Sequence, residues 1–245
     1  DIYFITNQSD KAISFSPSFK VKGMKPQLWN AVTGNIRALN EYTEEDGRTI
    51  VPIKMEPLQS WFIVFTSSEQ NNISKGYQDN FPETETQQIL QNPWKVEFKN
   101  KEIGPEKTIE FPTLTDWITH HNEKIKYYSG TAVYTSTFNY KKEVATKEVF
   151  IDLGSVGVMA SVKINGDDIG TTWIAPFKLN TKDALNEGEN TIEIEVVNVW
   201  RNRLTGDKTL PESERTTWVN VDGITPKEEL IPSGLLGPVT IQIIK

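Results

Sequence analysis

The residues best suited to bind a ligand are a few aromatic and planar polar side chains on predicted loops. They are Trp173 on one loop, Arg201, Asn202, Arg203 and Asp207 on a second loop, and Tyr128 just before a long predicted strand. A pyranose ring presents a patch of C–H groups that a stiff aromatic face can cover. Guanidinium, amide and carboxylate groups bind the hydroxyls, and arginine is well suited to bidentate polar contacts. These residue types predict a carbohydrate-binding surface on loops at the rim of a domain.

The same residues have structural interpretations, which the sequence leaves open. Trp173 can contact a ligand, pack against another domain, or belong to the core. Arg201 and Arg203 can pair with Asp207 and so brace their own loop. Large aromatic side chains are also needed to fill the interior of a sandwich domain. We therefore expect Trp94, Trp117, Trp200 and Tyr134 to be core residues.

A catalytic pair of acids is not indicated. Glycosidases need two carboxyl groups that converge on one bond from different elements. The 33 Asp and Glu residues instead gather in turns or alternate along a strand, as Glu193 and Glu195 do. No repeated strand–helix alternation that would build a glycosidase barrel is present. The sequence therefore predicts no catalytic residue.

Metal and cofactor motifs are equally sparse. His120 and His121 are the only histidines and there is no cysteine, so a zinc site lacks ligands and both histidines are expected at the surface or in a cap. No GxSxG elbow, P-loop or dinucleotide fingerprint occurs. A structural calcium ion is the alternative to no cofactor, because loop aspartates supply hard oxygen ligands. The candidates are Asp152, Asp167, Asp168 and Asp183.

Alternating strands are predicted around the Trp173 loop. Ala160, Val162 and Ile164 alternate with polar residues and are followed by Asn165-Gly166, which is the strongest short signal for a hairpin with a type I′ turn. Further along, Ile192, Ile194 and Val196 alternate with Thr191, Glu193 and Glu195. One face of each strand is therefore apolar, which indicates a β-sandwich with decorated rims.

A family resemblance follows from these segments. The order LGSV, VKINGDDIGTTWIAPF and LNEGENTIEIEVVNVWRNRLTGD resembles the sugar-binding, galactose-binding-like jelly-roll domain of glycoside hydrolase family 2, over about residues 92–245. The segment IPSGLLGPV resembles the version in family 106 α-L-rhamnosidases. The resemblance implies a non-catalytic accessory portion of a bacterial glycoside hydrolase. Such a portion would support the catalytic domain, contact a plant or host glycan through rim loops, and work outside the cytoplasm.

The predicted fold is all-β, in three parts. Residues 1–68 are expected to form a small β-sandwich, because YFITNQ, PQLWNAVTG and WFIVFTS resemble the spacer domain that follows the barrel in large glycosidases. Residues 69–88 carry many Asn, Gln and Glu residues and are predicted to be a connector. Residues 89–245 are predicted to be the jelly-roll domain. A strand that begins at Ile2 suggests a piece of a longer polypeptide.

Composition excludes some partners. The net charge is −7 and the sequence pI is about 5.1, so no basic stripe is available to bind nucleic acid. No apolar run approaches the roughly 20 residues of a membrane span. Two rival functions remain. A protein-interaction or adhesion module would expose a broad apolar patch, whereas a self-contained glycosidase would hold two acids facing each other in one cleft.

Overall fold

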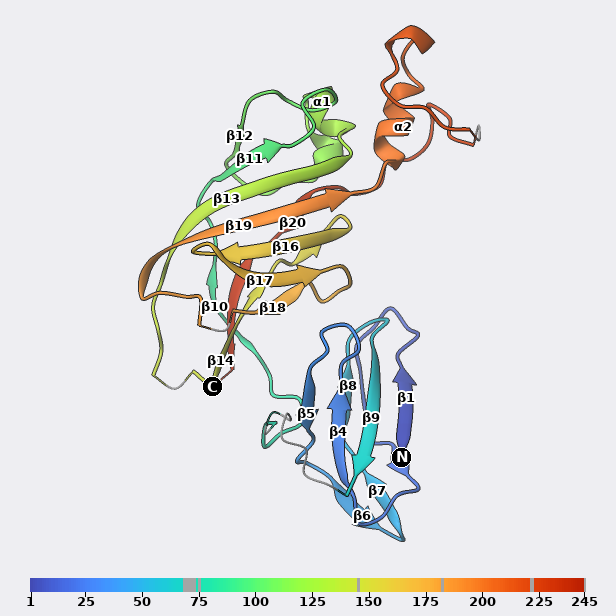
Figure 1. The fold of residues 1–245 in the computed structure, drawn as a ribbon, viewed down its shortest axis with the longest axis vertical. Helices are drawn as coiled ribbons and strands as arrows, with labels where there is room; N and C mark the ends of the chain where they lie inside the picture. Colours follow the sequence, from blue (N-terminus) through green and yellow to red (C-terminus); the bar gives the residue numbers. More distant parts are fainter. Residues whose placement is uncertain (68–73, 75, 145, 182, 221–222, 245) are drawn as a thin grey trace. The chain divides into compact units, whose positions relative to one another are not determined.

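The chain forms two compact units, Asp1–Glu83 and Thr84–Lys245, in a computed structural model that describes residues 1–67, 74, 76–144, 146–181, 183–220 and 223–244. Nearly all of the regular secondary structure in both units is β-strand (Figure 1), so the all-β prediction is confirmed. Within the described residues, no helix has the length and apolar character needed to cross a membrane.

The first unit is a small sandwich of short strands. One layer has the strand order β1-β9-β4-β5, and the strands β2-β8 and β3-β7-β6 pack on the same core. The strands are β1 (Ile2–Thr6), β2 (Ile13–Phe15), β3 (Ser18–Phe19), β4 (Lys25–Trp29), β5 (Ile36–Ala38), β6 (Thr43–Glu45), β7 (Arg48–Ile50), β8 (Ile53–Met55) and β9 (Ser60–Thr66). Val51, Met55 and Ile63 are fully buried at its centre.

The boundary between the units, at Glu83 and Thr84, lies within the range 69–88 predicted to be a connector, and described residues on both sides of it belong to the units. Residues 69–73 and 75 of that range lie outside the described residues. Asn80 belongs to the first unit: it is 1% exposed, and its Nδ2 donates to the carbonyl oxygens of Glu41 at 2.7 Å and Pro52 at 3.2 Å. Phe81 packs against the core of the first unit. Strand β10 (Glu85–Ile89) already belongs to the second unit, because it pairs with β21 (Thr240–Ile244).

The second unit is a larger sandwich of two main sheets. The six-stranded sheet has the order β12-β11-β13-β19-β16-β17 and the four-stranded sheet the order β10-β21-β14-β18, while β15 and β20 form a short pair. The further strands are β11 (Trp94–Phe98), β12 (Ile109–Phe111), β13 (Gly130–Tyr140), β14 (Glu148–Asp152), β15 (Ser155–Val156), β16 (Met159–Ile164), β17 (Asp167–Thr172), β18 (Lys178–Asn180), β19 (Gly188–Asn198) and β20 (Leu235–Gly237).

The two strand patterns predicted from the sequence are confirmed. Strands β16 and β17 form the hairpin, with Ile164 opposite Asp167 and positive φ at both Asn165 (53°) and Gly166 (90°), as a type I′ turn requires. Ile192, Ile194 and Val196 on β19 are fully buried. Strand β19 pairs along its whole length with β13, and these two strands form the middle of the core.

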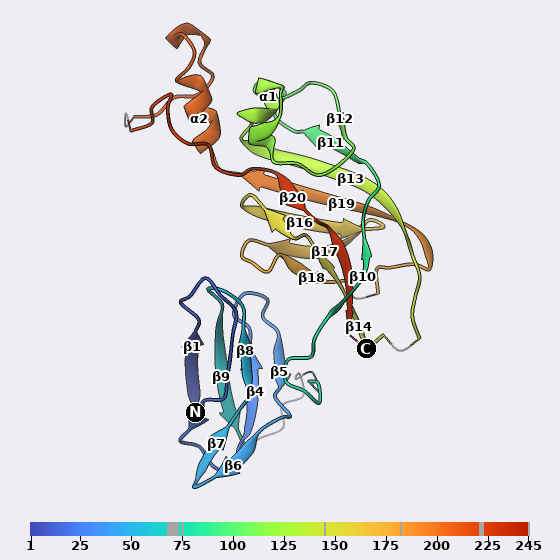
Figure 2. The ribbon, with the colours of Figure 1, turned by 180° about the vertical axis from the view of Figure 1, so that it is seen from behind.

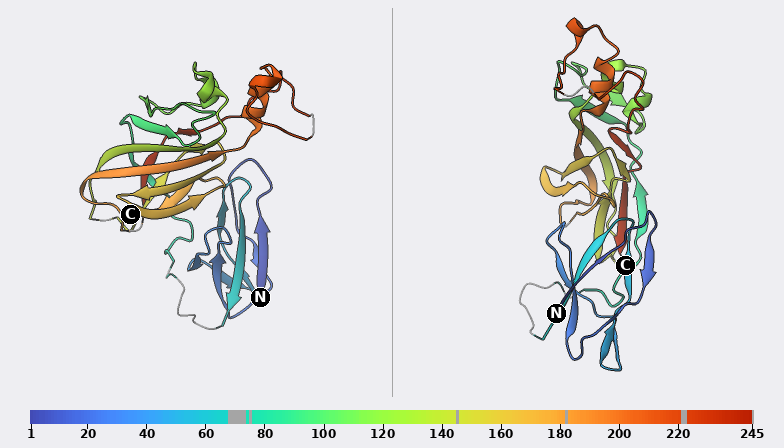
Figure 3. Two further views of the ribbon diagram at one scale, coloured as in Figure 1. Left: turned by 45° about the horizontal axis from the view of Figure 1, so that its top comes forward. Right: turned by 90° about the vertical axis from the view of Figure 1, so that its right-hand side faces the viewer.

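Four short helices lie outside the sheets in the described part of the chain. They are η1 (Trp117–Thr119), α1 (Glu123–Lys126), α2 (Arg201–Asp207) and η2 (Glu212–Glu214). The side chain of Asn122 caps α1 by accepting from Lys124 N at 3.0 Å. Helices α1 and α2 lie at the same end of the six-stranded sheet (Figure 2, Figure 3). We call this end, where β13 begins and β17 and β19 finish, the rim.

Candidate functional site

Trp173 lies at the rim with its side chain largely in solvent. Strand β17 ends at Thr172, which pairs with Ala160 near the start of β16, so the chain leaves the sheet at Trp173. Its exposed fraction is 54%, and that of Ile174 is 41%. The hydroxyl of Thr172 donates to Ile174 O at 3.4 Å at the base of the loop. The core interpretation of Trp173 is therefore excluded, while ligand contact and packing against another domain remain.

The other tryptophans divide in a way that only partly follows the prediction. Trp94 and Trp117 are buried, at 1% and 0% exposed, beside Tyr134 at 0%, and the indole of Trp117 donates to Tyr134 Oη at 2.6 Å. The expectation that these three are core residues is confirmed. It is wrong for Trp200, which is 50% exposed. Strand β19 ends at Asn198, so Trp200 has already left the sheet.

Residues 199–220 and 223–233 belong to an excursion between β19 and β20. The side chain of Asn202 joins its outgoing and returning segments. Asn202 is 1% exposed. Its Nδ2 donates to Ile231 O and to Ser233 Oγ, each at 2.7 Å, and its Oδ1 accepts from Ile231 N at 2.9 Å. At the base of the excursion, Gly234 N donates to Asn198 Oδ1 at 3.3 Å. Because these groups are used within the excursion, the Asn202 side chain is not presented to a ligand.

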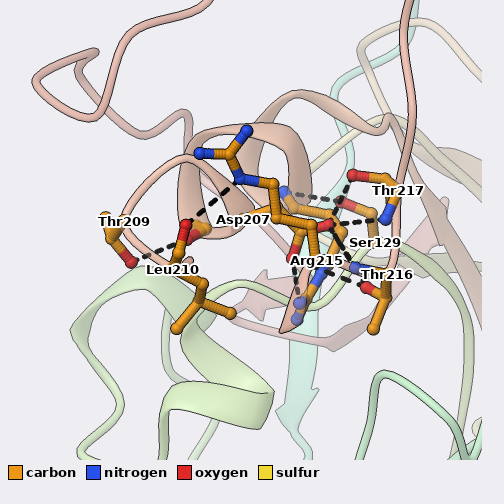
Figure 4. A network of polar contacts seen from close by, with 9 residues as sticks. Ser129, Asp207, Thr209, Leu210, Arg215, Thr216 and Thr217 are labelled. Carbon is orange, nitrogen blue, oxygen red and sulfur yellow. Dashed lines mark hydrogen bonds and ion pairs between the residues drawn. The ribbon is translucent and has the colours of Figure 1, made fainter. Parts of the chain in front are cut away.

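Asp207 is the centre of a second polar network within the excursion, and Figure 4 shows it beside Thr216 and Thr217. Arg203 Nη2 donates to the Asp207 carboxylate in an ion pair of which both side chains are at least nine-tenths buried. The carboxylate also accepts from the backbone N–H groups of Thr216 at 3.0 Å and Thr217 at 2.7 Å. The bracing interpretation therefore holds for this pair. Arg201 departs from it, because Arg201 pairs with Glu228 at 3.2 Å.

The electrostatics of Asp207 follow from these contacts. Burial by itself raises the pKa of the carboxyl, but hydrogen bonds from Thr217 and Arg203 outweigh burial and hold the pKa below its ordinary value. A lowered pKa makes Asp207 a poor proton donor at neutral pH, whereas a glycosidase acid needs a raised pKa. Thr216 and Thr217 were not predicted to take part, because their role depends on a chain return nine and ten residues after Asp207.

Tyr128 is a correction to the predicted binding surface. It is fully buried, with its ring against Phe98 and Trp117 at centroid distances of 4.7 and 5.5 Å. Its hydroxyl accepts from Asn100 N at 3.0 Å and donates to Thr131 O at 2.8 Å, and burial raises the pKa of the phenol. Tyr128 therefore locks the turn before β13 and cannot face a ligand at the rim.

A shallow hollow of about 240 Å³ lies between α1 and α2. Its lining includes Glu102, Glu123, Lys124, Tyr127, Arg203 and Thr216. The Arg203 guanidinium is already paired with Asp207, so the remaining charged groups of the lining are Glu102, Glu123 and Lys124, with a net negative charge. A hollow of this character suits a neutral, hydroxyl-bearing group better than a phosphate. Of the predicted α2 residues, Arg203 lines this hollow and Arg201 lies on the exposed surface.

The proposed calcium ligands do not gather. In the part of the chain that the structure describes, no three Asp, Glu or His side chains are grouped as a metal site would need. Asp152 instead accepts from Gly154 N at 2.9 Å and from Gln242 Nε2 at 3.0 Å. Asp168 accepts from Gly170 N at 2.9 Å. These aspartates therefore stabilise turns and a strand pair.

The histidines lie where the sequence predicts them: His120 is in a cap and His121 is at the surface. His120 Nδ1 accepts from Asn122 N at 3.0 Å, just before α1. Partial burial, and then the neighbouring His121, lowers the pKa of His120. The two imidazole rings stack at a centroid distance of 4.4 Å, in the turn between η1 and α1.

Comparison with known proteins relates both units to glycoside hydrolases. Residues 1–44 match the family model of α-L-rhamnosidases of glycoside hydrolase family 106. Residues 111–228 match the model of the galactose-binding domain-like region of glycosyl hydrolase family 2. The resemblance to both families is confirmed. The family 106 match falls in the first unit, whereas the sequence interpretation had placed that likeness at IPSGLLGPV in the second.

A solved structure agrees with the chain over nearly its full length. The rhamnosidase from Novosphingobium sp. PP1Y matches 99% of this chain with a TM-score of 0.88 and 32% identity, which corresponds to 23% of the rhamnosidase. A Formosa agariphila protein provisionally named as a beta-glucuronidase is 38% identical over 64% of this chain. A beta-galactosidase of Clostridium acetobutylicum is 24% identical over 60% of it. The chain spans only 16% of each of these last two relatives.

Proposed function

We propose that this chain is a non-catalytic accessory region of a glycoside hydrolase, which supports a catalytic domain and contacts carbohydrate through the rim of its second unit. The observation that carries the proposal is the exposed indole of Trp173, 54% accessible, on a loop that begins where β17 leaves the sheet. A large, stiff aromatic face held in solvent is the kind of group that covers the C–H patch of a sugar. The related glycoside hydrolases supply the class of ligand.

Two further positions can add polar contacts. Arg201 is exposed at the start of α2 and Arg203 lines the hollow beside it. Exposed Trp200, which the sequence interpretation had assigned to the core, joins them at the end of β19. Adjacent strands are about 4.8 Å apart. Because β16 alone separates β17 from β19, the ends of those two strands are about 10 Å apart, a spacing suited to more than one sugar unit.

Calorimetry tests the carbohydrate contact. The probes are millimolar oligosaccharides ending in L-rhamnose, D-galactose or D-glucuronic acid, the sugar types named by the related enzymes. We expect Trp173→Ala to weaken binding roughly tenfold or more, as loss of a central aromatic contact does, and Trp173→Phe to retain most of it. Trp218→Ala is the control, because Trp218 is 84% exposed on the excursion. Unchanged binding by Trp173→Ala, or no binding of any probe, would refute the contact.

Hydrolysis assays test the accessory role. We expect the chain alone to leave aryl glycosides of the same three sugars intact, because Asp207 is held as a buried, paired carboxylate with a lowered pKa. Turnover by the 245-residue chain that disappears on replacing one acid would establish the self-contained glycosidase instead. A location outside the cytoplasm belongs to the same proposal, and fractionation of the producing cells tests it.

A further inference from the structure

One sheet of the first unit is apolar on a face that its own core does not use. In an antiparallel sheet, residues directly opposite one another share a face. The pairing of β1, β9, β4 and β5 therefore builds two rows on one side of the sheet. The first row is Phe4, Phe62, Trp29 and Ile36, and the second is Ile2, Val64, Gln27 and Ala38. We call this side the outer face.

The opposite side of the same sheet makes the core. Successive side chains of a strand point to opposite faces, and the residues between those of the outer face are Tyr3, Ile5, Leu28, Trp61 and Ile63. All five belong to the hydrophobic cluster of the first unit or pack against it. The strands β2, β3 and β8 contribute to that same cluster. The outer face is therefore additional to the core.

The outer face is mainly apolar and is most exposed along its β1 edge, whereas Val64 and Gln27 of the second row are buried, at 8% and 4% exposed. Ile2 and Phe4 on the edge strand β1 are 67% and 60% exposed, and the rings of Phe4 and Phe62 lie 5.1 Å apart. Gln27 is the polar member. Its Oε1 accepts from Trp29 Nε1 at 3.0 Å, so a polar atom of the face is satisfied by a neighbour. Exposed apolar patches of this kind mark interaction sites.

The sequences of the strands carry the same information. Strand β9 contains the uninterrupted apolar run WFIVF and β1 the run IYFI. Continuous apolar runs are typical of strands that are covered on both faces, whereas a strand with one wet face alternates. Strand β19 in the second unit shows that alternation, with Glu195 exposed between buried Ile194 and Val196. The sequences of β1 and β9 are therefore typical of strands in a sheet whose two faces are both covered, one by the core of the unit and the other by a further layer.

The size of the face indicates which kind of partner covers it. Four strands at about 4.8 Å and two rows about 7 Å apart give a patch of a few hundred Å². A stable complex of separate chains buries about 800 Å² on each partner, so the patch is small for a free dimer. A domain on the same polypeptide has a high effective concentration and needs less area. The relatives are long enough to carry one, because the chain spans 23% and 16% of them.

We propose that the outer face is the docking surface for a neighbouring domain of the same, longer polypeptide, which presents an apolar surface to Phe4, Phe62 and Trp29. This inference rests on the proposed accessory function, and it assigns the surface through which the chain would contact the domain that it supports. It does not depend on the sugar contact at Trp173, which is in the other unit.

Hydroxyl-radical footprinting of two proteins tests the docking. One is the 245-residue chain and the other is the complete polypeptide encoded by its gene. We expect oxidation of Phe4 and Trp29 to fall several-fold in the complete polypeptide, while exposed Leu58 and Trp218 change little. Unchanged oxidation of Phe4 would overturn the proposal, and so would a gene that encodes no further domain. Protection that rises with concentration of the short chain would identify a second copy as the occupant and overturn it too.

A matched pair of variants gives an independent measurement. Phe4 and Leu58 have similar exposed fractions, 60% and 64%, but Leu58 lies in the turn between β8 and β9, outside both rows. Phe4→Ser also removes the ring contact with Phe62, so each variant is compared between the two proteins. We expect Phe4→Ser to lower the Tm more in the complete polypeptide than in the short chain, and Leu58→Ser to lower it equally in both. An equal loss for Phe4→Ser in the two proteins would overturn the proposal. These measurements involve no sugar. The docking proposal can therefore be refuted while the sugar contact at Trp173 is supported, and the sugar contact can be refuted while docking is supported.

Discussion

Contacts of single side chains stabilise the conformation of the excursion after β19, and Asp207 makes the largest number of them. Its carboxylate balances the buried Arg203 guanidinium and accepts from two backbone N–H groups. Removing one partner of a buried ion pair leaves an uncompensated charge, which costs about 3–5 kcal/mol. We therefore expect Asp207→Asn to lower the free energy of unfolding of the second unit by an amount near the lower end of that range. Urea unfolding at neutral pH measures it, with exposed Asp167→Asn as the control expected within about 0.5 kcal/mol.

The pH dependence of stability follows from the same carboxyl. Its pKa is lower in the folded chain than in the unfolded chain, so the unfolded state binds its proton first as the pH falls. The stabilisation is therefore complete above the ordinary aspartate pKa of about 4, and it is lost as the pH drops through the folded value. We expect Asp207→Asn to flatten this part of the acid-unfolding curve. An unchanged curve would contradict the assigned role.

Residue type alone predicted burial well only where a strand pattern supported it. Trp94 and Tyr134 lie in alternating segments, and both are buried as expected. Trp200 and Tyr128 were assigned from size and neighbourhood, and both assignments were wrong, in opposite directions. Trp200 follows the last residue of β19, and Tyr128 reaches back to Asn100. Local composition predicts neither the residue at which a strand ends nor a contact between residues 28 positions apart.

At the scale of elements, the contact between α1 and α2 depends on a small residue. A Cβ added to Gly206 would lie 2.5 Å from the ring of Tyr127. Alanine normally stabilises a helix relative to glycine by about 1 kcal/mol, but overpacking costs about 1–3 kcal/mol. We expect Gly206→Ala to be destabilising on balance, and Tyr127→Ala to relieve part of the clash in the double variant, because the ring is removed while the Tyr127 Cβ at 2.9 Å remains. Thermal unfolding of the two single variants and the double variant measures this coupling, and additive effects would argue against the contact.

The β16–β17 hairpin offers a test free of packing effects. Gly166 has φ of +90° and no atom within 4 Å of an added Cβ, so only backbone strain opposes a side chain there. We expect Gly166→Ala to cost about 1–2 kcal/mol, visible as a lower midpoint in urea. Gly223→Ala is the matched control, because it is equally uncrowded and lacks the positive φ.

Elements with a strict period of two were the most predictable. The hairpin and β19 follow directly from their alternation, since a one-residue shift would expose the apolar set. The boundary near residue 83 lies inside the predicted connector. Its position within that range could not be predicted, because Asn80 and β10 are placed by long-range hydrogen bonds. The Asp207 network was foreseen only in part, for the same reason. The sequence identified Asp207 as the acceptor and Arg203 as its partner, but it did not identify Thr216 and Thr217 as donors.

At the scale of the whole molecule, we expect stability to be independent of calcium. The aspartates considered as ligands are used locally, as at Asp152 and Asp168, and do not converge within the described residues. Excess EDTA or added calcium should therefore leave the Tm unchanged, apart from a general ionic-strength effect that magnesium reproduces. A rise in Tm that calcium produces and magnesium does not would contradict this prediction and indicate a calcium site.

The way in which the excursion closes on itself has a practical consequence. Asn202 ties the outgoing limb to Ile231 and Ser233, and Gly234 meets Asn198 at the base. The outgoing and returning segments of the excursion are thus held close together where they meet the sheet. Loops whose ends already meet tolerate changes of length cheaply, because closing them costs little additional entropy. The exposed helix η2 (Glu212–Glu214) can therefore serve as a graft position, at which foreign peptides or short linkers are inserted while Asp207 keeps its contacts with Thr216 and Thr217.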